Sequence, residues 1–234
     1  ADGSKLSKRH GAQTVAEFRE LGYLPEALVN FLAFLGWSPG TEEEIFTLVV
    51  LRERMTFERL QSSPAILDQR RLDYLNGVWI RRLTVEDLAT RLRGYLPQAS
   101  EGQRQQIAAM VQTRIKRLSE VPELVAFAFS EPRPDAATLR GRLSDPQPLT
   151  FLTKARDLVD GDADSLLERL QELSHQLVDD PEQLKAQHRA FMQVLRVAIT
   201  GQMVSPPLPE SIALIGREAA LRRIDRALRQ LQGS

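Results

Sequence analysis

The amino-acid sequence predicts a mostly α-helical protein, and two patterns carry that prediction. Apolar residues recur three and four positions apart in one segment after another, and most of these segments open on a helix-capping residue. The sequence lacks a sustained alternation of apolar and polar residues, a long heptad pattern, and a repeat of about 20–50 residues. Its 234 residues are enough for one or two globular domains with a buried core.

Two helices are predicted in the first forty residues, each from a different kind of start signal. Thr14 and Glu17 have the spacing of a capping box, in which each side chain accepts a hydrogen bond from a free backbone N–H at the helix start. We expect that helix to stop at Gly22. Pro25 suits the first turn of a second helix, which presents an apolar face and ends at Gly36.

Two short helices are expected next, over residues 42–54 and 56–60. Phe46 and Phe57 are their expected apolar anchors.

Asp68 has the position of an N-cap for a helix that runs past Trp79, a residue we expect in the core. Thr84 opens another helix, so we place a domain boundary near Leu83. The later helices are expected over residues 101–113, 119–129, 149–159, 163–177 and 181–200, and an amphipathic helix closes the chain. Because of its three prolines, the segment 201–209 is expected to be a stiff, non-helical loop.

Composition excludes several classes of protein. With no Cys there is no disulfide scaffold or thiolate metal site, and a reducing compartment such as the cytoplasm is expected. The longest nearly apolar run, residues 28–37, is far too short to span a bilayer, so no membrane partner is expected. The sequence contains no catalytic triad, Walker loop, dinucleotide loop or metal-ligand cluster, so a complete active site is not expected in these residues.

Charge is balanced in total but uneven along the chain. There are 31 basic and 31 acidic residues, yet residues 156–189 hold nine acids against four bases, and residues 217–229 hold five Arg against two acids. Such a separation lets one face of a protein hold a polyanion. Mixed charge on ordinary helix surfaces is the alternative interpretation.

Two stretches are candidates for binding phosphates. Residues 5–9, Lys-Leu-Ser-Lys-Arg, place three cations between Gly3 and Gly11, which suits a loop that closes over a polyphosphate. Further on, Arg70, Arg71 and Tyr74 interleave cations with an aromatic ring, a combination typical of nucleic-acid contacts.

Taken in order, these segments resemble the C-terminal half of a bacterial-type glutamyl-tRNA synthetase. The matching stretches cover essentially the whole chain: residues 5–9, 22–32, 35–37, 44–48, 75–77, 79–81, 195–201, 214–218 and 221–223. The resemblance implies three parts, namely a phosphate-facing loop with a stem-contact domain (1–83) and two helical anticodon-binding subdomains (84–140 and 141–234) that form a cage.

The first stretch is similar to the class I signature Lys-Met-Ser-Lys-Ser, with Leu6 in place of Met and Arg9 in place of the last Ser. The resemblance implies that Lys5, Leu6, Ser7 and Lys8 bind ATP and that Lys5 and Lys8 stabilise charge that develops as the glutamyl adenylate forms. It also implies that the full-length enzyme uses L-glutamate and Mg²⁺ and acts as a monomer. Because the His-Ile-Gly-His-like element is missing, this fragment alone is predicted to be inactive.

The same resemblance implies the tRNA contacts. Stem contacts are expected from Arg71, Tyr74 and Asn76, and anticodon contacts from Arg114, Arg196, Ser205, Pro206 and Leu208. Arg114 has the chemistry to donate two hydrogen bonds to a cytosine at the last anticodon position, the letter that separates the glutamate tRNA from the glutamine tRNA. Its alternative role is that of a helix-end cap.

Two other interpretations stay open at this point. The chain could be a non-catalytic helical interaction module whose basic clusters are solvated. It could also be the glutaminyl relative, but that family's anticodon domains are β-barrels, which the helical signals contradict. Salt-dependent binding to tRNA(Glu) would distinguish the synthetase interpretation from the non-catalytic helical module. An enzyme that charges both tRNAs would bind tRNA(Gln) as well.

Overall fold

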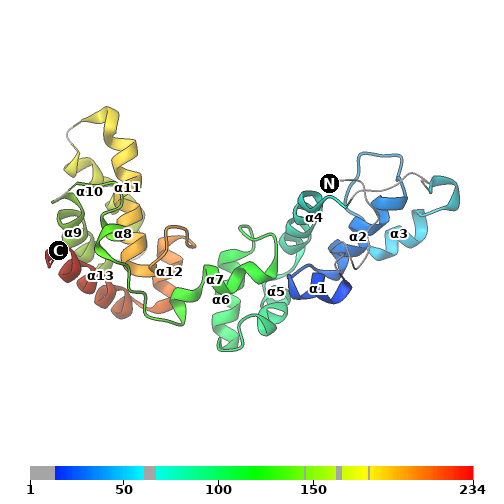
Figure 1. Ribbon diagram of the computed structural model, residues 1–234, viewed down its shortest axis with the longest axis horizontal. Helices are drawn as coiled ribbons and strands as arrows, with labels where there is room; N and C mark the ends of the chain where they lie inside the picture. The colour runs from blue at the N-terminus through cyan, green and yellow to red at the C-terminus, as the bar shows by residue number, and fades with distance from the viewer. Residues whose placement is uncertain (1–13, 61–66, 145, 162–164, 179, 234) are drawn as a thin grey trace. The chain divides into compact units, whose positions relative to one another are not determined.

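The computed structural model describes residues 14–60, 67–144, 146–161, 165–178 and 180–233 (Figure 1). The residues divide into two compact units, Ala1–Pro122 and Glu123–Ser234. The boundary expected near Leu83 lies inside the first of these units, and the division into three parts stays a prediction. Within the described ranges, no helix is long and apolar enough to cross a membrane.

The first unit is built from short helices packed in pairs. They are α1 (Val15–Glu20), α2 (Pro25–Gly36), α3 (Leu48–Arg54), η2 (Phe57–Arg59), α4 (Gln69–Arg82), α5 (Val85–Arg91), η3 (Leu92–Gly94), α6 (Glu101–Val111) and η4 (Leu118–Glu120), with α7 (Val121–Leu124) at the unit boundary. Helix α2 packs on α4, and α5 packs on α6. Phe18, Tyr23, Phe31, Leu72 and Leu75 form one buried cluster of this unit, and burying such side chains is the main favourable contribution to its folding.

The caps predicted for this unit are confirmed. Thr14 and Glu17 form both hydrogen bonds of the capping box. The Asp68 carboxylate accepts hydrogen bonds from the backbone N–H groups of Arg70 and Arg71, and Thr84 caps α5 through its hydroxyl. Short polar side chains at these positions satisfy backbone donors that the first helical turn leaves free.

The second unit holds the largest apolar cluster. Its helices are η5 (Ala126–Ala128), α8 (Ala136–Arg140), α9 (Gln147–Asp160), α10 (Leu166–Leu177), α11 (Pro181–Thr200), α12 (Leu208–Ile215) and α13 (Arg217–Gln232). Helix α9 packs against α10, α11 and α13. At the centre of the cluster the Phe151 and Phe191 rings stack with centroids 4.7 Å apart.

The fold class predicted from the sequence is confirmed, because the described residues contain helices and a single bridge between Trp37 and Leu60 but no strand. Four local predictions are wrong. Helix α3 begins only at Leu48 because Thr47 caps it. The expected helix over 119–129 is broken into three short pieces, and α12 starts inside the loop expected over 201–209, with Pro209 in its first turn. Phe57 is 89% exposed and anchors nothing.

Candidate functional site

The phosphate-binding loop expected at Lys5, Leu6, Ser7 and Lys8 lies outside the described residues. The candidate site is therefore built from the stem-contact and anticodon-contact residues. Among the described residues, no group of His, Asp or Glu is placed to hold a metal ion.

One face of α4 carries cations and a ring at helical spacing. Arg70, Tyr74 and Arg81 lie four and seven residues apart, so they share one side of the helix. All three are exposed, and Tyr74 keeps 51% of its surface. Within the described part of the chain, neither guanidinium has an acidic partner.

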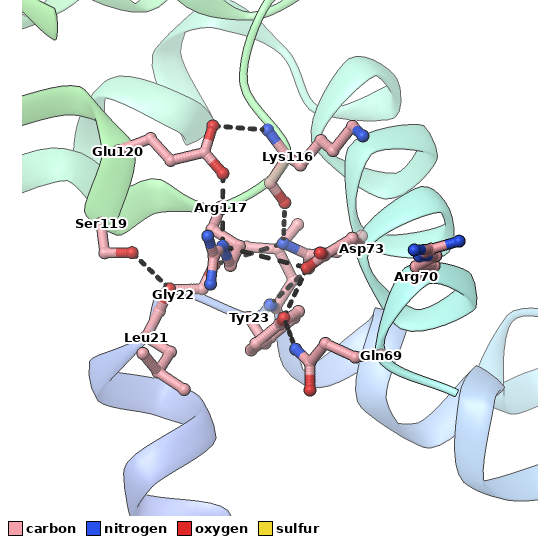
Figure 2. A network of polar contacts seen from close by, with 12 residues as sticks. Leu21, Gly22, Tyr23, Gln69, Arg70, Asp73, Lys116, Arg117, Ser119 and Glu120 are labelled. Atoms are coloured by element: carbon pink, nitrogen blue, oxygen red, sulfur yellow. Dashed lines mark hydrogen bonds and ion pairs between the residues drawn. The ribbon is translucent and has the colours of Figure 1, made fainter. Parts of the chain in front are cut away.

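A second segment lies within van der Waals reach of Gly77, on the same helix. A Cβ built on Gly77 would lie 3.7 Å from the Ile115 carbonyl oxygen and 3.8 Å from Lys116 Cα. The segment after α6 therefore packs close to α4, and it exposes Arg114 and Lys116. Figure 2 shows the Lys116 side chain extended towards α4. We call Arg70, Tyr74, Arg81, Arg114 and Lys116 the basic surface.

Arg114 has a free side chain in the described structure. Its backbone N–H donates to the Val111 carbonyl at 2.8 Å, but its exposed guanidinium makes no recorded hydrogen bond or ion pair with the residues described. The alternative role as a helix-end cap is therefore not the one it adopts here. Its five N–H donors are available to a ligand.

Arg71 is engaged within the protein. Its guanidinium lies 3.4 Å from the Glu44 carboxylate and stacks 4.9 Å from the centroid of the Phe34 ring. Both charged side chains are exposed, so the ion pair is weak in water and can open for a stronger anion. We retain Arg71 as a neighbour of the basic surface.

Asn76, expected to contact RNA, is instead a buried structural residue. Its side chain has no exposed surface. Its amide oxygen accepts a hydrogen bond from the Leu24 N–H at 2.8 Å, and its amide nitrogen donates to the carbonyl oxygens of Gly22 and Lys116. Because a buried amide is costly to leave without partners, these bonds hold α4 against two loops that lie far apart in sequence.

Gly22 is the contact point of this network. Its φ of +85° suits glycine, and an added Cβ would lie 2.5 Å from the backbone nitrogens of Leu118 and Ser119. The Leu118 N–H donates to the Gly22 carbonyl at 3.1 Å, and the Ser119 hydroxyl donates to the Leu21 carbonyl at 2.6 Å. The segment that ends at Ser119 is thus fixed beside the basic surface.

Tyr23, the residue after Gly22, donates a hydrogen bond from its hydroxyl to the Asp73 carboxylate at 2.5 Å and accepts one from the Gln69 amide. Arg117 lies 3.9 Å from the same carboxylate and 3.3 Å from Glu120. Burial, together with the Asp73 carboxylate, raises the pKa of Tyr23 to about 12. The phenol therefore stays neutral and donates its hydrogen bond at any ordinary pH.

In the second unit, Arg196 holds the loop that follows α11. One guanidinium nitrogen donates to the Ser205 carbonyl at 2.9 Å and lies 3.3 Å from the Ser205 hydroxyl. Ser205, Pro206 and Leu208 are buried, so they shape the loop and leave little surface for a ligand.

Sequence reasoning missed the residues that this loop does expose, Met203 at 53% and Val204 at 76%. Their apolar type in a surface loop was the available signal. Exposed aliphatic side chains such as these can make van der Waals contact with a base, although they have no ring to stack on it.

The five arginines of α13, expected to form part of a basic side, are mostly engaged. Arg222 pairs with Glu218 at 2.7 Å, Arg226 pairs with Glu131 at 2.8 Å, and Arg217 donates to the Asp160 carbonyl. Arg223 is buried, and its burial lowers the pKa of the guanidinium. This helix therefore offers less free positive charge than its sequence indicates.

A helical chain whose basic surface has no acidic partner in the described ranges, and which exposes an aromatic ring there, has the features of a nucleic-acid-binding protein. The family comparisons agree. Residues 87–228 match the model of the anticodon-binding domain, and residues 1–74 match that of the class I tRNA synthetase (E and Q) catalytic domain. The chain belongs to the anticodon-binding domain family of these synthetases.

Individual relatives are glutamate–tRNA ligases. The chain is 37% identical to the ligase of Desulforamulus reducens over 97% of its own length, and 36% identical to that of Dehalococcoides mccartyi over 98%. It spans about half of these relatives, 49% of each, and corresponds to their C-terminal half. The resemblance predicted from the sequence is confirmed.

Solved structures show the same fold. The glutamate tRNA ligase of Elizabethkingia meningosepticum matches 97% of this chain and 49% of its own, with a TM-score of 0.78 at 20% identity. The glutamate-tRNA synthetase of Elizabethkingia anophelis gives a TM-score of 0.76.

Proposed function

We propose that this chain is the tRNA-binding portion of a glutamate–tRNA ligase, the enzyme that joins glutamate to its tRNA through an adenylate made from ATP. The observation that supports it most directly is the basic surface, which lies within a chain related along its length to such ligases. Four cations that have no acidic partner among the described residues, beside an exposed ring, suit a ligand with regularly spaced phosphates and accessible riboses.

Within this proposal the basic surface contacts the tRNA backbone. Arg70, Arg81 and Lys116 neutralise phosphates, and Tyr74 lies against a ribose or base. Arg71 joins them when its exposed pair with Glu44 opens. Asn76 takes no part in binding, because its amide is already occupied inside the protein.

Arg114 is the proposed specificity residue. Its free guanidinium suits the O2 and N3 edge of a cytosine at the last anticodon position, and a guanine there presents donors instead. By analogy with base readout in DNA, the discrimination is about 1–3 kcal/mol. Arg196, Ser205, Pro206 and Leu208 shape the second set of anticodon contacts, and Met203 and Val204 are the exposed side chains of the loop before α12.

Catalysis is proposed for the full-length protein only. Lys5, Leu6, Ser7 and Lys8 are the proposed ATP-binding residues, Lys5 and Lys8 acting on the phosphates, with Mg²⁺ and L-glutamate bound by the remainder of the enzyme. The full-length enzyme is proposed to act as a monomer in the cytoplasm. If Arg114 does not discriminate between the two anticodons, the enzyme would charge tRNA(Gln) as well.

The first test is a titration of the 234-residue chain with tRNA(Glu) and tRNA(Gln) at two or more salt concentrations. Each phosphate contact releases counterions, so the logarithm of the binding constant should fall by about 0.7–0.9 per contact for each tenfold rise in salt. Three contacts or more are expected from the basic surface. Binding that is absent, or independent of salt, would favour a helical module that binds no nucleic acid.

The second test is charging of both tRNAs by the full-length enzyme with Arg114→Gln. Loss of the bidentate contact should reduce kcat/KM for the glutamate tRNA and narrow its advantage over the glutamine tRNA. Arg54→Gln is the matched control, because Arg54 is also exposed but is paired with Glu43. Unchanged discrimination by the Arg114 variant would refute the assignment.

A further inference from the structure

A buried arginine of α13 joins three segments of the second unit. Arg223 is 5% exposed. One guanidinium nitrogen donates to the Ile199 carbonyl at 2.8 Å, and the other donates to the carbonyls of Phe127 at 3.0 Å and Ser130 at 3.2 Å. Its Nε lies 3.8 Å from the Glu131 carboxylate.

This arrangement satisfies groups that a helix end leaves free. Ile199 belongs to the last turn of α11, where carbonyl groups have no N–H further along the helix to accept from. A cation at that end is also favoured by the helix dipole. The planar guanidinium has several nitrogens, so it can donate to carbonyl groups at two separated positions at once. Lysine has a single ammonium nitrogen and cannot reach both positions.

The end of α11 is the element that carries the proposed anticodon contacts. Arg196 lies one turn before Ile199 and donates to the Ser205 carbonyl. Just beyond the helix, Gly201 has a φ of +70°, and a Cβ there would lie 2.5 Å from Pro132 Cβ. Gln202 donates to the Glu123 carbonyl at 2.7 Å. The helix end and its loop are thus held against residues 123–132.

We propose that Arg223 is a positioning residue for anticodon recognition: by tying the end of α11 to the segment from Phe127 to Ser130, it fixes Arg196 and the loop 201–207 in the conformation that receives RNA. It does not touch RNA itself, since it is buried, its two terminal nitrogens donate to backbone carbonyls, and its Nε faces the Glu131 carboxylate. The inference rests on the proposed function for its purpose, but the geometry that it predicts can be measured without RNA.

The variants are Arg223→Gln and Arg223→Lys, with Arg222→Gln as the matched control. Arg222 is the neighbouring residue on the same helix, but it is exposed and pairs with Glu218 one turn away. The control therefore makes the same change of charge without touching the helix end. If the glutamine variant does not fold, the same measurements on the lysine variant test the proposal. Lysine keeps the positive charge but cannot donate to the end of α11 and to the segment from Phe127 to Ser130 at the same time.

The first measurement is backbone hydrogen exchange of the free chain. Exchange at residues 196–207 should accelerate about tenfold or more in Arg223→Gln, the factor expected when a charge-assisted hydrogen bond is lost. Exchange elsewhere in the second unit, and throughout Arg222→Gln, should stay at the wild-type rate. An unchanged rate at residues 196–207 would overturn the proposal, and so would an equal acceleration of the entire second unit, which signals a merely structural role.

The second measurement is binding to tRNA(Glu) and to three variants, each with one anticodon base replaced. For at least one of the three replacements, the ratio of the binding constants for natural and altered tRNA should fall about tenfold in Arg223→Gln. The salt dependence of binding should stay unchanged. Wild-type preferences kept in full by the variant would count against the proposal. If the wild-type chain shows no preference, the proposed function fails instead, and hydrogen exchange alone then decides the role of Arg223.

Discussion

Gly22 packs directly against the backbone of Leu118 and Ser119, which lie far from it in the sequence, so Gly22→Ala should lower the free energy of unfolding. The new Cβ would enter the backbone of Leu118 and Ser119 at 2.5 Å, at a φ of +85° that disfavours alanine. We expect a loss of about 1–3 kcal/mol in urea unfolding. The control is Gly102→Ala, at an open helical position, which should gain about 0.5–1 kcal/mol. Equal effects of the two changes would contradict this account.

Tyr23 makes the stability of the same unit depend on alkaline pH. Its pKa is raised to about 12 in the folded protein, whereas an unfolded chain has the ordinary value near 10. The stabilisation is therefore complete below about pH 10 and is lost as pH rises through 12. The difference in unfolding free energy between wild type and Tyr23→Phe should shrink over that interval. A difference that stays constant from pH 8 to 12 would show that the phenol is not held as described.

Arg70 and Arg81 lie on one face of α4 and have no acidic partner in the part of the chain that the structure describes, so their removal should change the salt dependence of tRNA binding. The double substitution of Arg70→Gln and Arg81→Gln should lower the salt slope of tRNA binding by about 1.5–2, near one unit per phosphate contact. Arg54→Gln should leave the slope unchanged, because Arg54 pairs with Glu43. Loss of affinity without a change of slope would mean that these arginines do not contact phosphates.

Helix starts could be predicted from the sequence because a cap is a local device. Thr14, Asp68 and Thr84 cap the helices that their sequence positions indicate. The helix predicted over residues 42–54 begins only at Leu48. Ahead of it the Asn30 side chain bonds to the backbone of Glu44 and Phe46, a contact between segments that no local pattern reveals.

The candidate site was harder to predict because a polar residue can serve either the surface or the core. Asn76 lies four residues from both Leu72 and Ile80, which are buried, and that spacing was the available sign of burial. Arg223 lies likewise on the buried face of α13, between Ala220 and Ala227. The family resemblance implied RNA contact for Asn76, whereas helical position indicates a structural role for both Asn76 and Arg223.

Each of the two units has a core of its own, and this bears on how the protein can bind a long RNA. The largest apolar cluster lies wholly between Leu139 and Leu231, in the second unit, whereas the cluster around Phe31 lies in the first. Arg114 belongs to the first unit and Arg196 to the second. If the proposed contacts are correct, one RNA engages two units joined by a single chain, so each raises the effective concentration of the other at its site.

Separate cores predict separate unfolding. Phe191→Ala removes a ring that stacks on Phe151 and should destabilise the second unit by about 3–5 kcal/mol. Leu88→Ala, at a fully buried position of α5, should destabilise the first unit by about 2–5 kcal/mol. Calorimetry of the 234-residue chain should show two transitions, each variant lowering one midpoint and leaving the other in place. A single transition lowered by both would mean that the units fold as one, and RNA binding would then be a property of one rigid surface.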